Sequence, residues 1–335
     1  MKIDGHIPSE LDKAGPAARA LEAAGYNCGA SNETKHDPFL PLAVASQTTT
    51  TLELLTSIIV AFSRNPMTLA QVGHDLNAAS KGRFIMGLGT QIAPHITKRF
   101  SMPWSSPAPR MREMIQAMHA VWDCWYDGKP LDFRGEFYTH TLMTPYFVPD
   151  DRDYGRPRIM LAAVGPVMTR VAAEVADGVL CHGFTTPKYM HEVTIPKIEQ
   201  TLAAAGRDRK KFDIVAQLFT VVGDTDEPLA KGMEAIRGQI SFYGSTPAYK
   251  GVFEVHGWHD LQPQLNLLSK QGKWQEMSDL LTDEVVDAFA VVGTAEQVAD
   301  KLIRLYAGKV DRTGFPFTDL DPDRQKELLK KLKAA

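Results

Sequence analysis

Glu33 and His182 are the residues of this sequence best suited to exchange a proton during a reaction. Glu33 stands beside Asn32, just past an apolar segment, and His182 closes another apolar segment. A carboxylate or an imidazole can transfer a proton, and side chains at the C-terminal ends of parallel strands meet in one active site. A surface carboxylate and a structural histidine are the plainer interpretations, and both stay open.

The corner at Gly165-Pro166, where an apolar segment meets a helical pattern, is a candidate anion site. Proline is tolerated in a first helical turn because the amide that it lacks would be unpaired there anyway. The amides of Val167 and Met168 stay free, and the helix dipole favours an anion beside them. A tight turn with water on these amides explains the same residues, and no lysine stands in the segment.

Small residues end two other apolar segments. Ser57 interrupts "LELLTSIIVAFSRNP", and Gly87 and Gly89 stand in "GRFIMGLGTQ". Small side chains let a backbone approach a flat ligand closely. No motif for a metal site, a nucleophile elbow or a phosphate-binding lysine is present, so we expect no metal and favour chemistry carried by an organic cofactor.

Apolar, β-branched segments alternate with helical patterns and must position these residues. They predict strands over residues 2–6, 26–30, 54–60, 83–88, 158–163, 178–182, 212–221 and 287–292. Eight strand-helix units predict an α/β fold of the (β/α)8 TIM barrel type. A doubly wound sheet is the alternative, although no GxGxxG follows the first strand.

Two stretches are longer than a barrel crossover needs. They cover about residues 91–156 and 225–285, so we expect insertions after strands 4 and 7 of a single domain over residues 1–335. In a barrel, both insertions would begin at the C-terminal face, where active sites are built.

Composition excludes several classes of protein. The chain has 335 residues, 44% of them hydrophobic, and a net charge of -3, without a basic stripe, so nucleic acid is not an expected partner. No apolar run is long enough to cross a membrane, and the N-terminal residues do not resemble a signal peptide. Cys28, Cys124 and Cys181 lack CxxC spacing, which predicts reduced thiols in a cytoplasmic protein.

Taken together, three segments resemble the bacterial luciferase-like superfamily, and within it the branch that uses the deazaflavin coenzyme F420. They are "ALEAAGYNCGASNETKHDPFLPLAVASQTT", "IIVAFSRNPMTLAQVGHDLNAASKGRFIMGLGT" and "AAVGPVMTRVAAEVADGVLCH". The resemblance covers nearly the whole chain. It implies a (β/α)8 barrel with the coenzyme ring over its mouth, a small-molecule substrate and a homodimer.

The resemblance also implies which residues contact the coenzyme. A non-prolyl cis peptide bond at Ser57-Ile58 would support the back of the ring, and Val60 would contact the ring or its side chain. Thr90 and Gln91, after Gly89, match contacts to the ring edge and side chain. The residues that match the phosphate-binding segment are Ala163, Val164, Gly165, Pro166, Val167 and Met168.

The sequence departs from its relatives at positions that matter for the reaction. Many relatives carry Asp-His or Glu-His where this chain has Asn32-Glu33. Ile92 and Thr185 stand where the sugar-phosphate dehydrogenase branch has a glutamate and a lysine, which argues against a sugar phosphate as substrate. Three aromatic residues are candidate walls of an apolar substrate pocket, although core packing explains each equally well: Phe62, Trp104 and Tyr243.

Three functions follow from these features. The first is an F420-dependent oxidoreductase that moves a hydride between the deazaflavin and an alcohol/carbonyl pair or an activated alkene, with Glu33 or His182 exchanging the proton. The second is an FMN-dependent monooxygenase. The third is a non-catalytic flavin-binding relative, which the Asn32-Glu33 departure suggests. The uncharged corner at Gly165 favours the single charge of a phosphodiester, as in F420, over the phosphomonoester of FMN.

Overall fold

The structure is a computed structural model that describes residues 1–315 and 320–335. Within these ranges, eight parallel strands close into a barrel because β3 pairs with β5 and β1 pairs with β13. In chain order the barrel strands are β1 (Lys2–His6), β2 (Cys28–Ser31), β3 (Glu53–Thr56), β5 (Phe84–Gly89), β8 (Arg158–Ala163), β9 (Gly178–Cys181), β10 (Asp213–Ala216) and β13 (Arg312–Gly314). The predicted (β/α)8 fold is confirmed.

The eighth barrel strand is not the predicted one. Where a strand over 287–292 was expected in the barrel, β12 (Ala290–Gly293) pairs instead with β11 (Phe219–Val222) in a separate two-stranded parallel sheet. β13 takes the place in the barrel. It has only three residues and begins with the buried Arg312, so it lacks the apolar run by which strands are found in a sequence.

Two predicted strands are divided in the structure. The segment 54–60 gives β3 and the two-residue β4 (Ile59–Val60), which pairs with β5. The segment 212–221 gives β10 in the barrel and β11 outside it. In each case the chain leaves the barrel wall near the C-terminal end of a strand.

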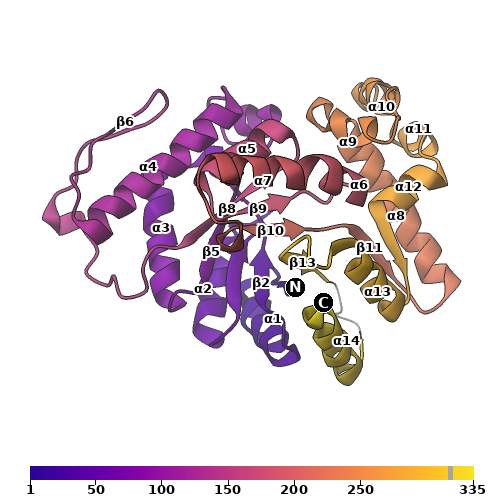
Figure 1. Cartoon of the computed structure of the whole chain (residues 1–335), viewed down its shortest axis with the longest axis horizontal. Helices are drawn as coiled ribbons and strands as arrows, with labels where there is room; N and C mark the ends of the chain where they lie inside the picture. Colours follow the sequence, from indigo (N-terminus) through magenta and orange to yellow (C-terminus); the bar gives the residue numbers. More distant parts are fainter. Residues whose placement is uncertain (316–319) are drawn as a thin grey trace.

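Helices surround the barrel strands (Figure 1). The long ones are α1 (Leu11–Ala24), α2 (Phe39–Thr48), α3 (Pro66–Ala79), α4 (Pro107–Asp127), α5 (Pro166–Val175), α7 (Ile195–Ala204), α13 (Ala295–Tyr306) and α14 (Pro322–Ala334). Local signals fix several ends: the Asn65 side chain accepts the Thr68 amide, and Gly25 ends α1 at a φ of 96°. No helix within the described ranges is long and apolar enough to cross a membrane.

The first insertion follows β5 and ends before β8. It contains α4 and a small hairpin of β6 (Phe133–Arg134) and β7 (Thr139–His140), which projects from the molecule (Figure 1). Short 3₁₀, π and α segments complete the chain outside the second insertion: Ala61–Ser63, His95–Arg99, Pro145–Phe147, α6 (Pro187–Tyr189), Met190–Thr194 and Arg209–Lys211.

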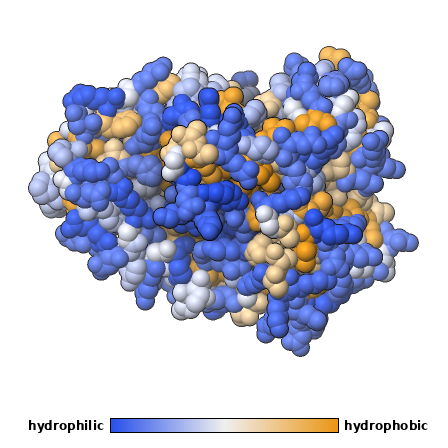
Figure 2. Space-filling view, in the orientation of Figure 1, coloured by the Kyte–Doolittle hydropathy of each residue, from blue (hydrophilic) through white to orange (hydrophobic). Residues whose placement is uncertain are grey.

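The second insertion, here called the insertion lobe, runs from β11 to β12. Its helices are α8 (Asp226–Gly244), the 3₁₀ turn Pro247–Tyr249, α9 (Lys250–Glu254), α10 (Leu261–Lys270), α11 (Trp274–Asp279) and α12 (Asp283–Phe289). The lobe contributes most of an apolar cluster that includes Ile240, Phe253 and Phe289 and is separate from the main one. Figure 2 shows a largely hydrophilic surface, with hydrophobic residues gathered on the side of this lobe.

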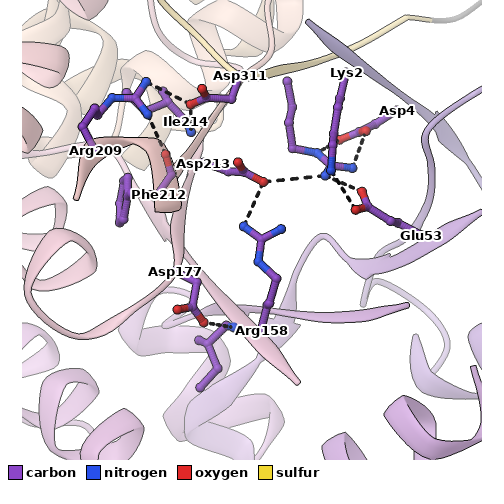
Figure 3. Close-up of polar contacts among 12 residues, drawn as sticks. Lys2, Asp4, Glu53, Arg158, Asp177, Arg209, Phe212, Asp213, Ile214 and Asp311 are labelled. Carbon is purple, nitrogen blue, oxygen red and sulfur yellow. Dashed lines mark hydrogen bonds and ion pairs between the residues drawn. The ribbon is translucent and has the colours of Figure 1, made fainter. Parts of the chain in front are cut away.

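The floor of the barrel, at the N-terminal ends of its strands, is closed by ion pairs (Figure 3). Arg312 is fully buried and donates to both carboxylate oxygens of Asp4, at 2.8 and 3.1 Å, and to Glu53 at 2.5 Å. Arg158 donates to Asp213 at 2.9 Å. Burial raises the pKa of Asp4, and Arg312 opposes that effect. Each charge of the floor therefore has a partner of opposite sign.

Candidate active site

An apolar layer fills the middle of the barrel, and the mouth lies two residues beyond it, towards the C-terminal ends of the strands. That layer consists of Cys28, Leu55, Ile85, Met160, Leu180 and Val215. Because alternate residues of a strand face the same side, the next inward positions on these strands are Ala30, Ser57, Gly87, Ala162, His182 and Gln217, and His6 of β1 is in register with Ala30. These residues are small or neutral and polar, so a flat ligand could lie above the middle layer.

The predicted cis peptide bond at Ser57-Ile58 is present. The Ser57 amide donates to Ser31 at 2.7 Å, and the Glu33 amide donates to the Ile58 carbonyl at 3.1 Å, so the end of β2 holds this segment from both sides. Gly89 packs against it, because a Cβ there would lie 2.7 Å from Ile58 Cδ1. The cis segment is thus fixed at the mouth by two neighbouring strands.

Glu33 is engaged in the scaffold of this segment. Its Oε2 accepts the Val60 amide and an Arg64 guanidinium N–H, each at 2.7 Å, and Arg64 also pairs with Asp37 at 2.8 Å. The Glu33 side chain is 7% exposed. Asn32, next to it, is half-buried at the end of β2. The carboxylate is therefore close to the predicted site, with one oxygen already occupied by two donors.

His182 presents a neutral N–H donor. Its Nδ1 accepts the Phe184 amide at 2.9 Å, which assigns the ring proton to Nε2. Desolvation lowers the pKa of His182 to about 4, so the ring is uncharged at neutral pH. His182 is consequently suited to donate a hydrogen bond to a substrate oxygen, rather than to act as a cationic acid.

The Gly165 corner forms an open cradle. Gly165 precedes α5 with extended backbone, and the Thr169 amide and hydroxyl bind its carbonyl at 3.1 and 3.0 Å. Among the described residues the amides of Val167 and Met168 have no acceptor, and the Val167 side chain is 56% exposed. Apart from its chain neighbours, the one atom of the described residues within 4 Å of a Cβ on Gly165 would be the Ala248 carbonyl oxygen, at 4.0 Å. Free amides and open space fit a bound phosphate.

The remaining predicted cofactor residues lie around the same mouth. Thr90 and Gln91 follow β5, and Gln91 adopts a left-handed φ of 58° with its side chain accepting the Ile92 amide at 3.0 Å. Ala163, at the end of β8, is buried, and the Val164 carbonyl accepts the Tyr189 hydroxyl at 3.3 Å. The neighbouring Pro166 is exposed at the first position of α5, and the Val60 side chain is fully buried.

The three predicted wall residues fall into two groups. Phe62 is fully buried, and the Arg110 guanidinium carbon lies 4.4 Å from the centre of the Phe62 ring. Trp104 packs edge-on against Phe62, with 5.8 Å between the ring centres. Tyr243 instead reaches from the insertion lobe to His182, with ring centres 4.7 Å apart. Phe62 and Trp104 thus support the first insertion, whereas Tyr243 stands at the mouth.

Sequence reasoning missed three residues of the mouth. His6 ends β1 and Gln217 follows β10, and the strand-end signal that identified His182 applies equally to both. Burial lowers the pKa of His6. Tyr249 lies in the insertion lobe with its ring centre 5.4 Å from that of His182, and no local pattern indicates a contact between residues so far apart in the chain.

Comparisons with known proteins match nearly the whole chain. The family model for luciferase-like monooxygenases matches residues 3–312. An uncharacterized protein of Mycobacterium tuberculosis is 51% identical over 312 residues, which cover 93% of this chain and 92% of that protein. A 5,10-methylenetetrahydromethanopterin reductase of Archaeoglobus fulgidus is 29% identical over 295 residues, with coverages of 86% and 83%.

A solved structure shares the fold. It is the coenzyme F420-dependent tetrahydromethanopterin reductase from Methanopyrus kandleri, with a TM-score of 0.76 and 21% identity. The superposition covers 98% of this chain and 96% of that one. At this identity the likeness concerns the fold, which agrees with the closed barrel described above.

Proposed function

The chain belongs to the luciferase-like monooxygenase family, and from this premise we propose that it is an F420-dependent oxidoreductase. Its substrate would be a small organic molecule, either an alcohol/carbonyl pair or an activated alkene. When bound, the deazaflavin supplies a ring carbon that accepts or donates a hydride. The F420-dependent neighbour in fold supports this choice of coenzyme.

The observation that carries the proposal is that the Ser57-Ile58 segment and the open, uncharged corner at Gly165 both lie at the C-terminal ends of barrel strands, around one mouth. Residues Ala163–Met168 would hold the phosphodiester through the amides of α5, while Ser57 and Ile58 would support the back of the ring. Residues Gly89–Gln91 would meet the edge of the ring. The cradle segment itself contains no charged side chain, which suits an anion of single charge.

His182 would act on the substrate oxygen. In carbonyl reduction the carbonyl carbon accepts the hydride, the π-bond pair moves to oxygen, and the oxygen then takes a proton from solvent. A fixed neutral N–H donor stabilises the charge that develops on that oxygen. Glu33 would instead hold the cis segment through Val60 and Arg64, with Asn32 beside it at the rim.

Two alternatives remain distinguishable. An FMN-dependent monooxygenase is favoured by the name of the family and by the free amides of Val167 and Met168, which would bind any phosphate. A non-catalytic flavin-binding protein is favoured by the engagement of Glu33 with Arg64. These alternatives differ from the proposal in which coenzyme binds and in whether turnover follows.

The deciding experiment titrates the purified protein with F420 and with FMN and follows coenzyme fluorescence. We expect F420 to bind at least about tenfold more tightly, with hydride transfer to at least one member of a panel of aldehydes, ketones and enones. Oxygen uptake is measured with each reduced coenzyme. Tight FMN binding together with oxygen consumption contradicts the proposal. Stoichiometric F420 binding without turnover across the panel favours the non-catalytic alternative.

A homodimer in the cytoplasm stays a prediction. Leu142, Tyr146 and Phe147 are exposed in the first insertion, by 77, 91 and 65% respectively, and could be covered in a dimer. Sedimentation equilibrium at micromolar concentration tests the assembly: a monomer would contradict it.

A further inference from the structure

The insertion lobe places two tyrosines against His182. Tyr243 comes from α8 and packs edge-on to the imidazole, with 4.7 Å between ring centres and 78° between planes. Tyr249 comes from the 3₁₀ turn that follows, with its ring centre 5.4 Å from that of His182. Three rings from two parts of the chain thus converge at the end of β9.

The hydroxyls of Tyr243 and Tyr249 and the Nε2–H of His182 are hydrogen-bond donors that have no acceptor in the part of the chain that the structure describes. Within the described residues, neither tyrosine hydroxyl has a hydrogen-bond partner, and Nδ1 is the nitrogen of His182 that is bonded. Burial, and secondarily the proximity of Tyr243, raises the pKa of Tyr249 to about 12. Tyr249 therefore keeps its hydroxyl proton and His182 carries a single ring proton, so both side chains are neutral at physiological pH.

Apolar rings surround the donors. Phe219 lies parallel to Tyr243, at 6.4 Å and 20°, and Phe184 lies parallel to Tyr249, at 5.6 Å and 21°. Each tyrosine ring thus packs against a phenylalanine ring, which restricts its orientation. The cluster combines flat apolar walls with neutral donors.

We propose that His182, Tyr243 and Tyr249 form a donor site for the oxygen of a planar aromatic or conjugated carbonyl substrate. This proposal rests on the proposed function, in which that oxygen gains negative charge as hydride arrives. Neutral donors in a desolvated site stabilise a developing oxyanion strongly and do not need to be reorganised. The aromatic rings select a flat substrate, and the uncharged walls disfavour a sugar phosphate.

The test uses 4-nitrophenol as a probe of the site, with and without F420. Its phenolate is a planar oxyanion whose absorption differs from that of the phenol, so binding and ionisation are read in one titration. We expect the wild-type protein to bind the phenolate and to lower the pKa of the bound phenol. The ether 4-nitroanisole, which has no ionisable oxygen, measures the contribution of the aromatic walls.

The variants Tyr243→Phe and Tyr249→Phe each remove one hydroxyl and keep the ring. We expect each to weaken phenolate binding about tenfold or more, because hydrogen bonds to charged acceptors are strong, and to leave 4-nitroanisole binding unchanged. Tyr306→Phe is the matched control, since it removes a buried hydroxyl of α13 that has no partner within the described residues. Thermal unfolding verifies that all three variants are folded.

Three outcomes would overturn the inference. The first is that the wild type does not bind the phenolate. The second is that the wild type and both variants bind the phenolate with equal affinity. The third is that the variants lose as much affinity for 4-nitroanisole as for the phenolate. A failure of F420 to bind would instead overturn the proposed function, and the measurements with 4-nitrophenol alone would still report on the donor site.

Discussion

At the floor of the barrel Arg312 is fully buried and bonded to Asp4 and Glu53, whereas at the mouth His182 has one ring nitrogen bonded and the other without an acceptor among the described residues. Both ends of the strands thus carry polar side chains, of which Arg312 at the floor is fully buried and His182 at the mouth is half-buried. The floor uses charges, each paired. The mouth uses neutral groups with unused hydrogen-bonding capacity, which costs less free energy than an unpaired charge would.

The paired charges of the floor contribute to stability, whereas the neutral groups of the mouth are suited to bind a ligand. A buried ion-pair network tolerates the loss of a member poorly, because the remaining charge stays desolvated. A neutral donor that has no acceptor in the free protein does not carry the free-energy cost of an unpaired, desolvated charge. We therefore expect substitutions at the floor to change the free energy of unfolding, and substitutions at the mouth to change ligand affinity.

The largest expected effect is at the floor. Arg312→Met should lower the free energy of unfolding by about 3–5 kcal/mol, since it leaves the Asp4 carboxylate buried and unpaired. Urea denaturation measures it. Lys2→Met is the control: Lys2 also pairs with Glu53 but its side chain is 42% exposed, so a change within about 1 kcal/mol is expected. Wild-type stability of Arg312→Met would refute the assignment.

The pH dependence of the free energy of unfolding tests the desolvation of His182. The pKa of His182 is about 4 in the folded protein and near 6.5 in the unfolded chain, so the unfolded chain takes up a proton first as pH falls. The stability that this group contributes is complete above about pH 6.5 and is lost towards pH 4, by about 3 kcal/mol. The measurement compares the wild type with His182→Gln across this range. Parallel curves would mean that the ring is not desolvated.

Glu33→Gln tests whether Glu33 supports the structure around the mouth or takes part in the reaction. The loss of the charge opposite Arg64 should destabilise the protein by about 1–3 kcal/mol and weaken coenzyme binding, because Glu33 holds Val60 and Arg64 beside the proposed ring site. Urea denaturation and coenzyme titration give the two values. A variant with unchanged stability and affinity but strongly reduced turnover would identify Glu33 as the group that exchanges the proton.

The smallest expected effect is at the Gly165 corner, the proposed phosphate site. Within residues 1–315 and 320–335, a Cβ on Gly165 meets no atom beyond its chain neighbours closer than 4.0 Å, so Gly165→Val should leave stability within about 0.5 kcal/mol of the wild type. It should nevertheless weaken coenzyme binding about tenfold by filling the cradle. Gly165→Ala should have a smaller effect in the same titration. Unchanged affinity in both variants would place the phosphate elsewhere.

The part of the site that the sequence predicted follows from features local to the chain. Ser57-Ile58 and Gly165-Pro166 each stand where an apolar strand ends, and the resemblance to the family identified the role of each pair. The strand that begins at Arg312 could not be found in the same way, because its side chain is charged and its burial depends on Asp4 and Glu53 from distant segments.

By itself, the sequence determined the barrel, the insertions after its fourth and seventh strands and the uncharged corner, since burial periodicity and small residues act within a few positions. The cis bond was expected from the resemblance to the family. Tertiary structure alone decided which segment closes the barrel, which proton His182 keeps, and that Glu33 is engaged with Arg64. It also brought Tyr243 and Tyr249 onto His182. These contacts join residues far apart in the chain, so they exist only once the insertion lobe and the strand ends have packed together.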